Sequence, residues 1–146
     1  MLDCAPILGL LTETRTLTLA TLDPDGSPRA TPLFFAPDDQ ADLYFLSSPD
    51  SPHSRNLARD PRAAVGVYPN EEKWENLRGL QMKGLAAIVP RSGKKKAMAV
   101  YKARYPFIGS LAAALALSEI YRFHPRWVRL IDNRQAFGYH AEWSLP

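Results

Sequence analysis

The sequence has few of the residues that build disulfides and metal sites. Its 146 residues include one cysteine, Cys4, and three histidines, His53, His124 and His140. A single cysteine cannot form an internal disulfide, and the histidines are too scattered for any Cys/His zinc spacing. We therefore expect no metal site and no disulfide framework.

Long apolar runs are also missing. The most apolar helix-like stretch, residues 110–117, is far shorter than the roughly 20 residues needed to cross a bilayer. The N-terminal stretch MLDCAPILGLL has an early acid and no basic segment before its apolar residues, so it does not resemble a signal peptide. These features predict a cytoplasmic protein with no membrane partner.

Charge of one sign is not in large excess. The 18 Lys and Arg against 15 Asp and Glu give a net charge of +3, which permits an anionic ligand without requiring nucleic acid. The lysine run 94–96 has little aromatic interleaving and is typical of a solvated helix face, so we expect no nucleic-acid partner. A chain of 146 residues with 46% hydrophobic content is enough for one core, which predicts one domain over residues 1–146.

Short strands dominate the pattern that remains. TLTLATL at 16–22 alternates in the period of a half-buried strand, and the turn DPDG leads into a second strand at 29–35. A third strand at 43–47 follows, so three antiparallel strands are expected in sequence. The other predicted elements are strands at 63–68, 80–89, 126–132 and 138–145 and helices at 3–13 and 92–106. The fold class is therefore mainly β with peripheral helices, an antiparallel barrel of about six strands.

A polar stretch, SSPDSPHSRNLARDP at 47–61, follows the third strand. Ser51 is placed to cap a short helix whose first residue is Pro52. The first turn of a helix exposes unpaired N–H groups and the positive end of the helix dipole, which suits phosphate or carboxylate. An ordinary capped surface loop is the alternative. The side chains that would add hydroxyl donors or positive charge are Ser47, Ser51, His53 and Arg55.

Four segments carry a resemblance to a known family. They are LATLDPDGSPRATPLFF, LYFLSSPDSPHSRNLARDPRAAVGV, LRGLQMKGLA and IDNRQAFGYHAEW. Their order and spacing resemble the pyridoxamine 5'-phosphate oxidase-like family of FMN-binding split β-barrels over about residues 15–143. The last segment is similar to a small bacterial subgroup rather than to the vitamin B6 oxidase itself.

The resemblance implies a homodimer that holds FMN in two clefts at the subunit interface. It places FMN contacts on the second strand at Thr31, Pro32 and Leu33, and at the end of the third strand at Leu46 and Ser47. The start of the following helix contributes Ser51 and His53, and Gln81 lies near the flavin ring. Late strands of the second subunit contribute Trp127 and Arg134.

Two departures from the family pattern affect function. Members that grip the phosphate strongly tend to have Arg and Lys at the positions aligned with Thr31 and His53, so this site carries less fixed charge. If protonated His53 supplies the charge, FMN affinity should fall from about pH 6 to about pH 8.5. The chain also lacks the C-terminal Arg and His motif of the vitamin B6 oxidase, so we do not expect oxidation of pyridoxamine phosphate.

The prediction for function is an FMN-dependent oxidoreductase acting on a small molecule. A bound flavin carries the hydride or electron chemistry, so no catalytic acid, base or nucleophile has to appear in the sequence. Neither Ser47 nor Ser51 lies in a G-x-S-x-G elbow, which argues against a serine hydrolase. The alternatives are a non-catalytic flavin or haem binding protein and a dimeric binding module that has lost its cofactor.

Overall fold

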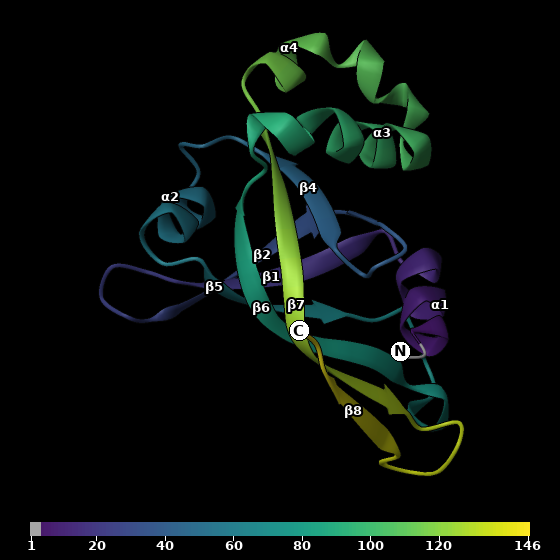
Figure 1. Ribbon diagram of the computed structural model, residues 1–146. Coiled ribbons are helices and arrows are strands. Elements are labelled where there is room, and N and C mark those ends of the chain that lie inside the picture. The colour runs from purple at the N-terminus through teal and green to yellow at the C-terminus, as the bar shows by residue number, and fades with distance from the viewer. Residues whose placement is uncertain (1–3) are drawn as a thin grey trace.

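The computed structural model describes residues 4–146, and these form one antiparallel sheet that curls into a half-barrel with helices around it (Figure 1). The strands are β1 (Thr16–Leu22), β2 (Pro28–Phe34), β3 (Ala36–Pro37), β4 (Leu43–Ser47), β5 (Arg62–Val67), β6 (Arg78–Ile88), β7 (Glu119–Asp132) and β8 (His140–Ser144). The helices are α1 (Ala5–Glu13), α2 (Pro52–Arg59), α3 (Lys94–Arg104) and α4 (Ala112–Ala116), with 3-10 turns η1 (Trp74–Asn76), η2 (Arg91–Gly93) and η3 (Pro106–Ser110). The predicted fold class, an antiparallel split β-barrel with peripheral helices, is confirmed.

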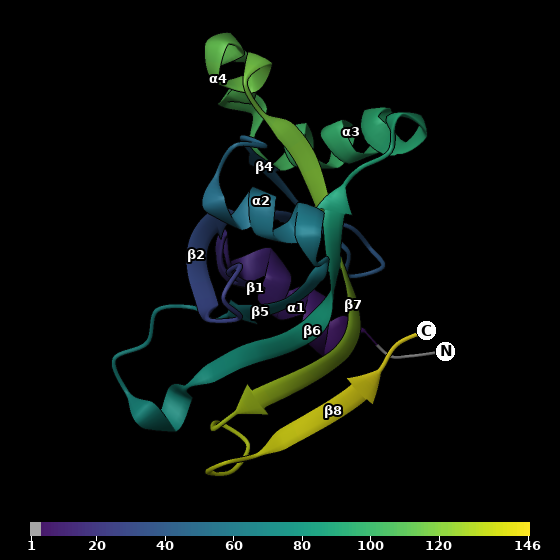
Figure 2. The same cartoon turned by 90° about the vertical axis from the view of Figure 1, so that its left-hand side faces the viewer.

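The long strand β7 divides the sheet. The strand order is β2-β1-β5-β6-β7-β4-β3, and β8 also pairs with β7. Residues 119–123 of β7 pair with β4, whereas residues 127–131 pair with β8. One edge of β7 therefore serves two different strands, and Figure 2 shows β4 and β8 at opposite ends of it.

The core lies on the concave side of the curled sheet. Alternation places Leu17 and Leu19 of β1 inside, at 2% and 0% exposure, and the rings of Phe45 and Tyr121 stack with centroids 5.2 Å apart. Helix α1 adds Ile7 to the same cluster. Burial of this apolar surface is the main stabilising term for the sheet.

Individual helices and strands follow the sequence pattern, but the position of β4 in the sheet does not follow from it. The helix predicted at 3–13 is α1, which begins at Ala5 with Cys4 as its N-cap; residue 3 lies outside the described part of the chain. The three antiparallel strands predicted in sequence are β1, β2 and β4, but β4 pairs with β7 and with the two-residue strand β3 rather than with β2. Strand β4 has both faces buried: Phe45 enters the main core, while Tyr44 packs in a second cluster with Tyr101 of α3. An edge position beside β2 would leave one face uncovered.

Strand β7 also begins seven residues earlier than predicted, at Glu119. Proline has no N–H for a sheet ladder, and Pro125 lies inside the strand. The register between β6 and β7 shifts between Lys83 and Gly84, so that Gly84 lies opposite Pro125. This bulge absorbs the proline and lets β7 continue.

Gly84 is required at the bulge because no side chain fits there. A Cβ on Gly84 would collide with the His124 carbonyl oxygen and lie 2.9 Å from Pro125 Cα. These are backbone atoms, so no rotamer change can relieve the contact.

We therefore expect Gly84→Ala to lower the free energy of unfolding by about 3 kcal/mol or more. Gly9→Ala is the matched control, because Gly9 is exposed in α1 and a Cβ there has no neighbour within 4 Å. It should raise stability by about 0.5–1 kcal/mol. Urea unfolding of both variants checks this, and equal stabilities would contradict the packing at Gly84.

Candidate functional site

The predicted cap and its neighbours form one hydrogen-bonded cluster at the start of α2. Ser51 Oγ accepts a hydrogen bond from Ser54 N at 3.4 Å, and Pro52 is the first helical residue. His53 Nε2 lies 2.6 Å from Ser47 Oγ and 3.2 Å from Ser51 Oγ. We call Ser47, Ser51 and His53 the Ser/His cluster. These three predicted site residues, from β4 and α2, are therefore in mutual contact.

The Ser/His cluster is buried and largely neutral. His53 is 7% exposed and Ser47 is 9% exposed. Burial, and next the positive charge of Arg29, lower the pKa of His53 below its usual value of 6.5. The structure therefore disfavours the charged form of His53, which weighs against the charged role expected for this residue.

The predicted residues on β2 alternate between its two faces. Thr31 lies opposite Leu19 and Leu33 opposite Leu17, both core residues, so Thr31 and Leu33 share the inner face. Pro32 lies on the outer face. Leu46, on β4 next to Ser47, packs against the second core cluster beside α3.

A hydrogen-bond network fixes α2 against the β1–β2 hairpin. Asn56 Nδ2 donates to Thr21 Oγ1 at 3.0 Å and to Asp23 Oδ1 at 2.8 Å, while Asn56 Oδ1 accepts from Arg59 at 3.1 Å. Asp23 also accepts from Arg29, with Nε–Oδ1 at 2.8 Å and Nη2–Oδ2 at 3.2 Å. These bonds, Arg29 first and Asn56 next, lower the pKa of the Asp23 carboxyl.

Sequence reasoning missed Arg29. The strand period gives the signal, because Arg29 precedes Thr31 by two residues and must share its face. Both residues lie on the inner face of β2, and Arg29 lies opposite the buried Thr21.

A polar cleft of about 460 Å³ opens between the β1–β2 turn and α2. Basic and acidic side chains share its walls, so its charges nearly balance. Its lining consists of Asp23, Pro24, Asp25, Arg29, Asp50, Pro52, Arg55, Asn56 and Arg59.

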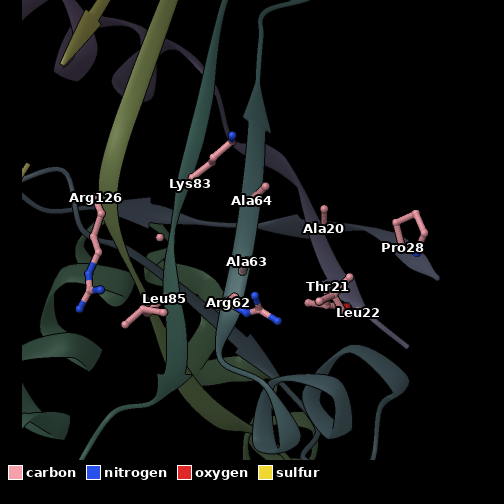
Figure 3. Close-up of a pocket in the computed structure, with 11 residues that line it drawn as sticks. Ala20, Thr21, Leu22, Pro28, Arg62, Ala63, Ala64, Lys83, Leu85 and Arg126 are labelled. Carbon is pink, nitrogen blue, oxygen red and sulfur yellow. The ribbon is translucent and has the colours of Figure 1, made fainter. Parts of the chain in front are cut away.

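The opposite surface of the sheet carries a second cavity, of about 450 Å³, which we call the outer-face groove. Figure 3 shows the side chains that line it, which come from β1, β2, β5, β6 and β7. Three basic side chains also line it: Arg62, Lys83 and Arg126. None of the Ser/His cluster residues lines this groove.

Gln81 and Trp127, two of the predicted flavin contacts, lie beside the outer-face groove. An adjoining cavity of about 380 Å³ is lined by both of them and shares Ala20, Ala64 and Lys83 with the groove. Lys83 Nζ lies 5.1 Å from the centroid of the Trp127 ring. Gln81 and Trp127 thus lie on the other face of the sheet from Thr31 and Leu33 of the same chain.

Arg134 also lies apart from the Ser/His cluster. It belongs to the β7–β8 turn at the lower end of the sheet, away from α2 in both Figure 1 and Figure 2. Its guanidinium pairs with Asp132 at 2.9 Å, and this bond raises the pKa of Arg134.

Within residues 4–146, no group of three or more His, Cys, Asp or Glu side chains is arranged to hold a metal ion. No helix in this part of the chain is both long enough and apolar enough to span a membrane.

Comparison with known proteins points to one family. The family model described as pyridoxamine 5'-phosphate oxidase matches residues 7–132. No curated protein matches the sequence significantly.

Among solved structures, a conserved hypothetical protein from Mycobacterium tuberculosis is 25% identical, with a TM-score of 0.79 and coverage of 100% of this chain and 93% of that one. A heme binding protein from Mycobacterium smegmatis is 19% identical, with a TM-score of 0.79, and the match covers 99% of this chain but only 59% of that one. A FAD-binding protein from Mesorhizobium loti is 22% identical, with a TM-score of 0.68 and coverage of 87% and 90%. The last two likenesses show a shared fold alone.

The lowered pKa of His53 predicts a pH effect on stability. When the pH falls below about 6.5, His53 of the unfolded chain takes up a proton that the folded state resists, so the folded state loses stability. We expect His53→Gln to lose less unfolding free energy than the wild type between about pH 7.5 and about pH 5.5. Urea unfolding at both pH values measures this, with the exposed His140→Gln as control. Equal losses in the wild type and His53→Gln would contradict it.

Proposed function

Because the chain belongs to the pyridoxamine 5'-phosphate oxidase family, we propose that it binds FMN and acts as a flavin-dependent oxidoreductase on a small molecule. The observation that carries this proposal is the Ser/His cluster at the first turn of α2, a helix that is hydrogen-bonded to the β1–β2 hairpin. The phosphate would lie at this turn and the flavin ring along β2.

The first turn of α2 suits a phosphate monoester. Two hydroxyls, Ser47 and Ser51, converge there with the positive end of the helix dipole. Hydroxyl and N–H donors grip a phosphate through charge-assisted hydrogen bonds, which are roughly twice as strong as neutral ones. Riboflavin has no phosphate to receive them, so the site would favour FMN over riboflavin.

Strand β2 suits the flavin ring. It ends the strand order and pairs only with β1 among the described residues, so its other edge has backbone groups free to bond a polar ring edge. Leu33, half-buried on the inner face, supplies apolar contact. When bound, the flavin would supply the hydride or electron chemistry, while these residues bind and orient it.

Haem is the second candidate, because the Mycobacterium smegmatis neighbour is a heme binding protein and the Mesorhizobium loti neighbour a FAD-binding one. The histidines favour flavin. His53 is buried against two serines, and both ring nitrogens of His124 have partners: Nδ1 lies 2.6 Å from Asp42 Oδ1 and Nε2 lies 3.2 Å from the Pro146 carbonyl oxygen. Neither therefore presents a free ring nitrogen as an axial ligand, and His140 is exposed on β8.

We also propose that the protein is a homodimer joined through the outer-face groove. Thr18, Ala20, Ala64 and Gly66 are small, half-buried residues on this face that let another surface approach closely. Gln81 lies opposite Gly66 on the same face. A second copy seated there would cover the groove and bring its own Gln81 and Trp127 toward the flavin of the first.

For the flavin proposal, we expect FMN to bind at least about tenfold more tightly than riboflavin, equivalent to about 1.4 kcal/mol of phosphate recognition. Quenching of flavin fluorescence in a titration measures both affinities. Ser51→Ala should weaken FMN binding severalfold and cost about 1 kcal/mol of stability by loss of the cap. The control is Ser92→Ala, because Ser92 is exposed in η2.

The purified protein also tests whether the chain binds flavin and whether it is a catalyst. A purified protein that is colourless and ignores added FMN would refute flavin binding, and a Soret band would indicate haem instead. Oxidation of NADH or NADPH by the FMN-loaded protein with an artificial electron acceptor would support catalysis. FMN binding without such turnover would indicate a carrier.

For the dimer proposal, we expect Ala64→Arg to give a monomer in light scattering, because the long charged side chain would separate the two faces. Ala99→Arg is the control, since Ala99 is exposed on α3, away from the groove. A wild-type monomer that binds FMN tightly would contradict the proposed interface.

A further inference from the structure

The Ser/His cluster holds no permanent positive charge. Ser47 and Ser51 are neutral, as is Thr31 on β2, and burial disfavours the charged form of His53. A phosphate monoester carries about 1.5 to 2 negative charges at neutral pH. The cation that balances a phosphate at this turn must therefore come from another residue.

Arg29 is a cation near the start of α2, because it lines the polar cleft together with Pro52, the first residue of that helix. It lies on the inner face of β2, two residues before Thr31, and its charge acts on His53 strongly enough to help lower the pKa of that side chain. The other cations of the polar cleft are placed differently. Arg59, at the last turn of α2, donates to the Leu22 carbonyl, and Arg55 is exposed on the helix.

Asp23 holds the Arg29 guanidinium in one orientation. Nε and Nη2 donate to the two Asp23 carboxylate oxygens at 2.8 and 3.2 Å, and Asp23 is itself held by Asn56. The remaining terminal nitrogen, Nη1, has no hydrogen-bond partner within residues 4–146. The planar guanidinium thus keeps one donor nitrogen free while its direction is fixed.

We propose that Arg29, oriented by Asp23, binds the phosphate of FMN at the first turn of α2 and sets the preference for FMN over riboflavin. This inference rests on the proposed function and names the residue that would supply its charge. Arg29 is a binding residue in this proposal, and Asp23 is a positioning residue.

The Arg29–Asp23 pair contributes little to folding by itself. The two side chains are 42% and 22% exposed, and ion pairs that are exposed to solvent add little to protein stability. Removing the charge should therefore leave the protein folded, and its effect on binding can be measured directly.

The test compares FMN and riboflavin affinities of the full chain by isothermal titration at about pH 7.5, where the phosphate is mostly dianionic. Arg29→Gln should lose at least about tenfold in FMN affinity, as expected for one charge-assisted contact, while its riboflavin affinity stays at the wild-type value. The FMN affinity of Arg29→Lys should lie between those of the wild type and Arg29→Gln, because a lysine keeps the charge but not the planar guanidinium that Asp23 orients. The control is Arg91→Gln, since Arg91 is exposed in η2 and has no ion pair among the described residues.

The pH dependence separates Arg29 from His53. Asp23 and Arg29 face the phosphate position from the hairpin, Glu119 lies opposite Ser47 on β7, and Asp50 and Arg55 line the adjoining polar cleft. Carboxylate and guanidinium side chains are ordinarily charged throughout the range from about pH 7 to about pH 8.5, whereas an imidazole ordinarily loses its charge near this range. The ratio of FMN affinity to riboflavin affinity in the wild type should therefore stay constant over that range. A ratio that falls toward one as the pH rises would assign the charge to His53 and overturn the proposal.

Failure of the inference and failure of the proposed function give different results. If the wild type binds no flavin, the proposed function fails and this inference fails with it. If the wild type binds FMN and Arg29→Gln binds it equally well, only the role of Arg29 is refuted. Equal loss of FMN and riboflavin in Arg29→Gln would also refute it, because the residue would then support the ring site rather than the phosphate.

Discussion

The candidate site depends on the side chain of Asn56. Both hydrogens of its amide nitrogen are donated to the end of β1, to Thr21 and Asp23, and its oxygen accepts from Arg59. Asn56 is 3% exposed, so each unmade bond would leave a buried polar group unsatisfied at a cost of about 1–3 kcal/mol. This amide therefore fixes the first turn of α2 relative to the hairpin that carries Arg29.

Much of the fold was predictable from local signals. Strand β1 begins and ends at the residues where the Thr/Leu alternation does, and α2 begins after Ser51 because a cap and a first-turn proline are local features. The position of β4 was not predictable in this way, because it depends on which surfaces are available to cover both of its faces. The early start of β7 depends on Gly84 in another strand, which allows Pro125 to remain in the sheet.

The site was predictable in part for the same reason. The contact of Ser47 with Ser51 and His53 follows from a strand end and a helix start that are adjacent in sequence. The charge state of His53 does not follow, because it depends on burial by the assembled sheet and on Arg29, a residue distant in sequence. Gln81 and Trp127 were predicted as flavin contacts, and their position on the outer face fits that role only if the partner subunit supplies them.

The separation of the two faces links the proposed ligand to the proposed dimer. Thr31 and Leu33 face inward on β2 toward the phosphate end, whereas Pro32 faces outward in a row that continues through Thr18 to Gly66. Because β2 is an edge strand, one protomer would cover a flavin ring along β2 from one side only. Water would then reach the ring from the uncovered side. A second copy seated on the small residues of the outer-face groove would close that side, so a buried flavin and a dimer are expected to form together.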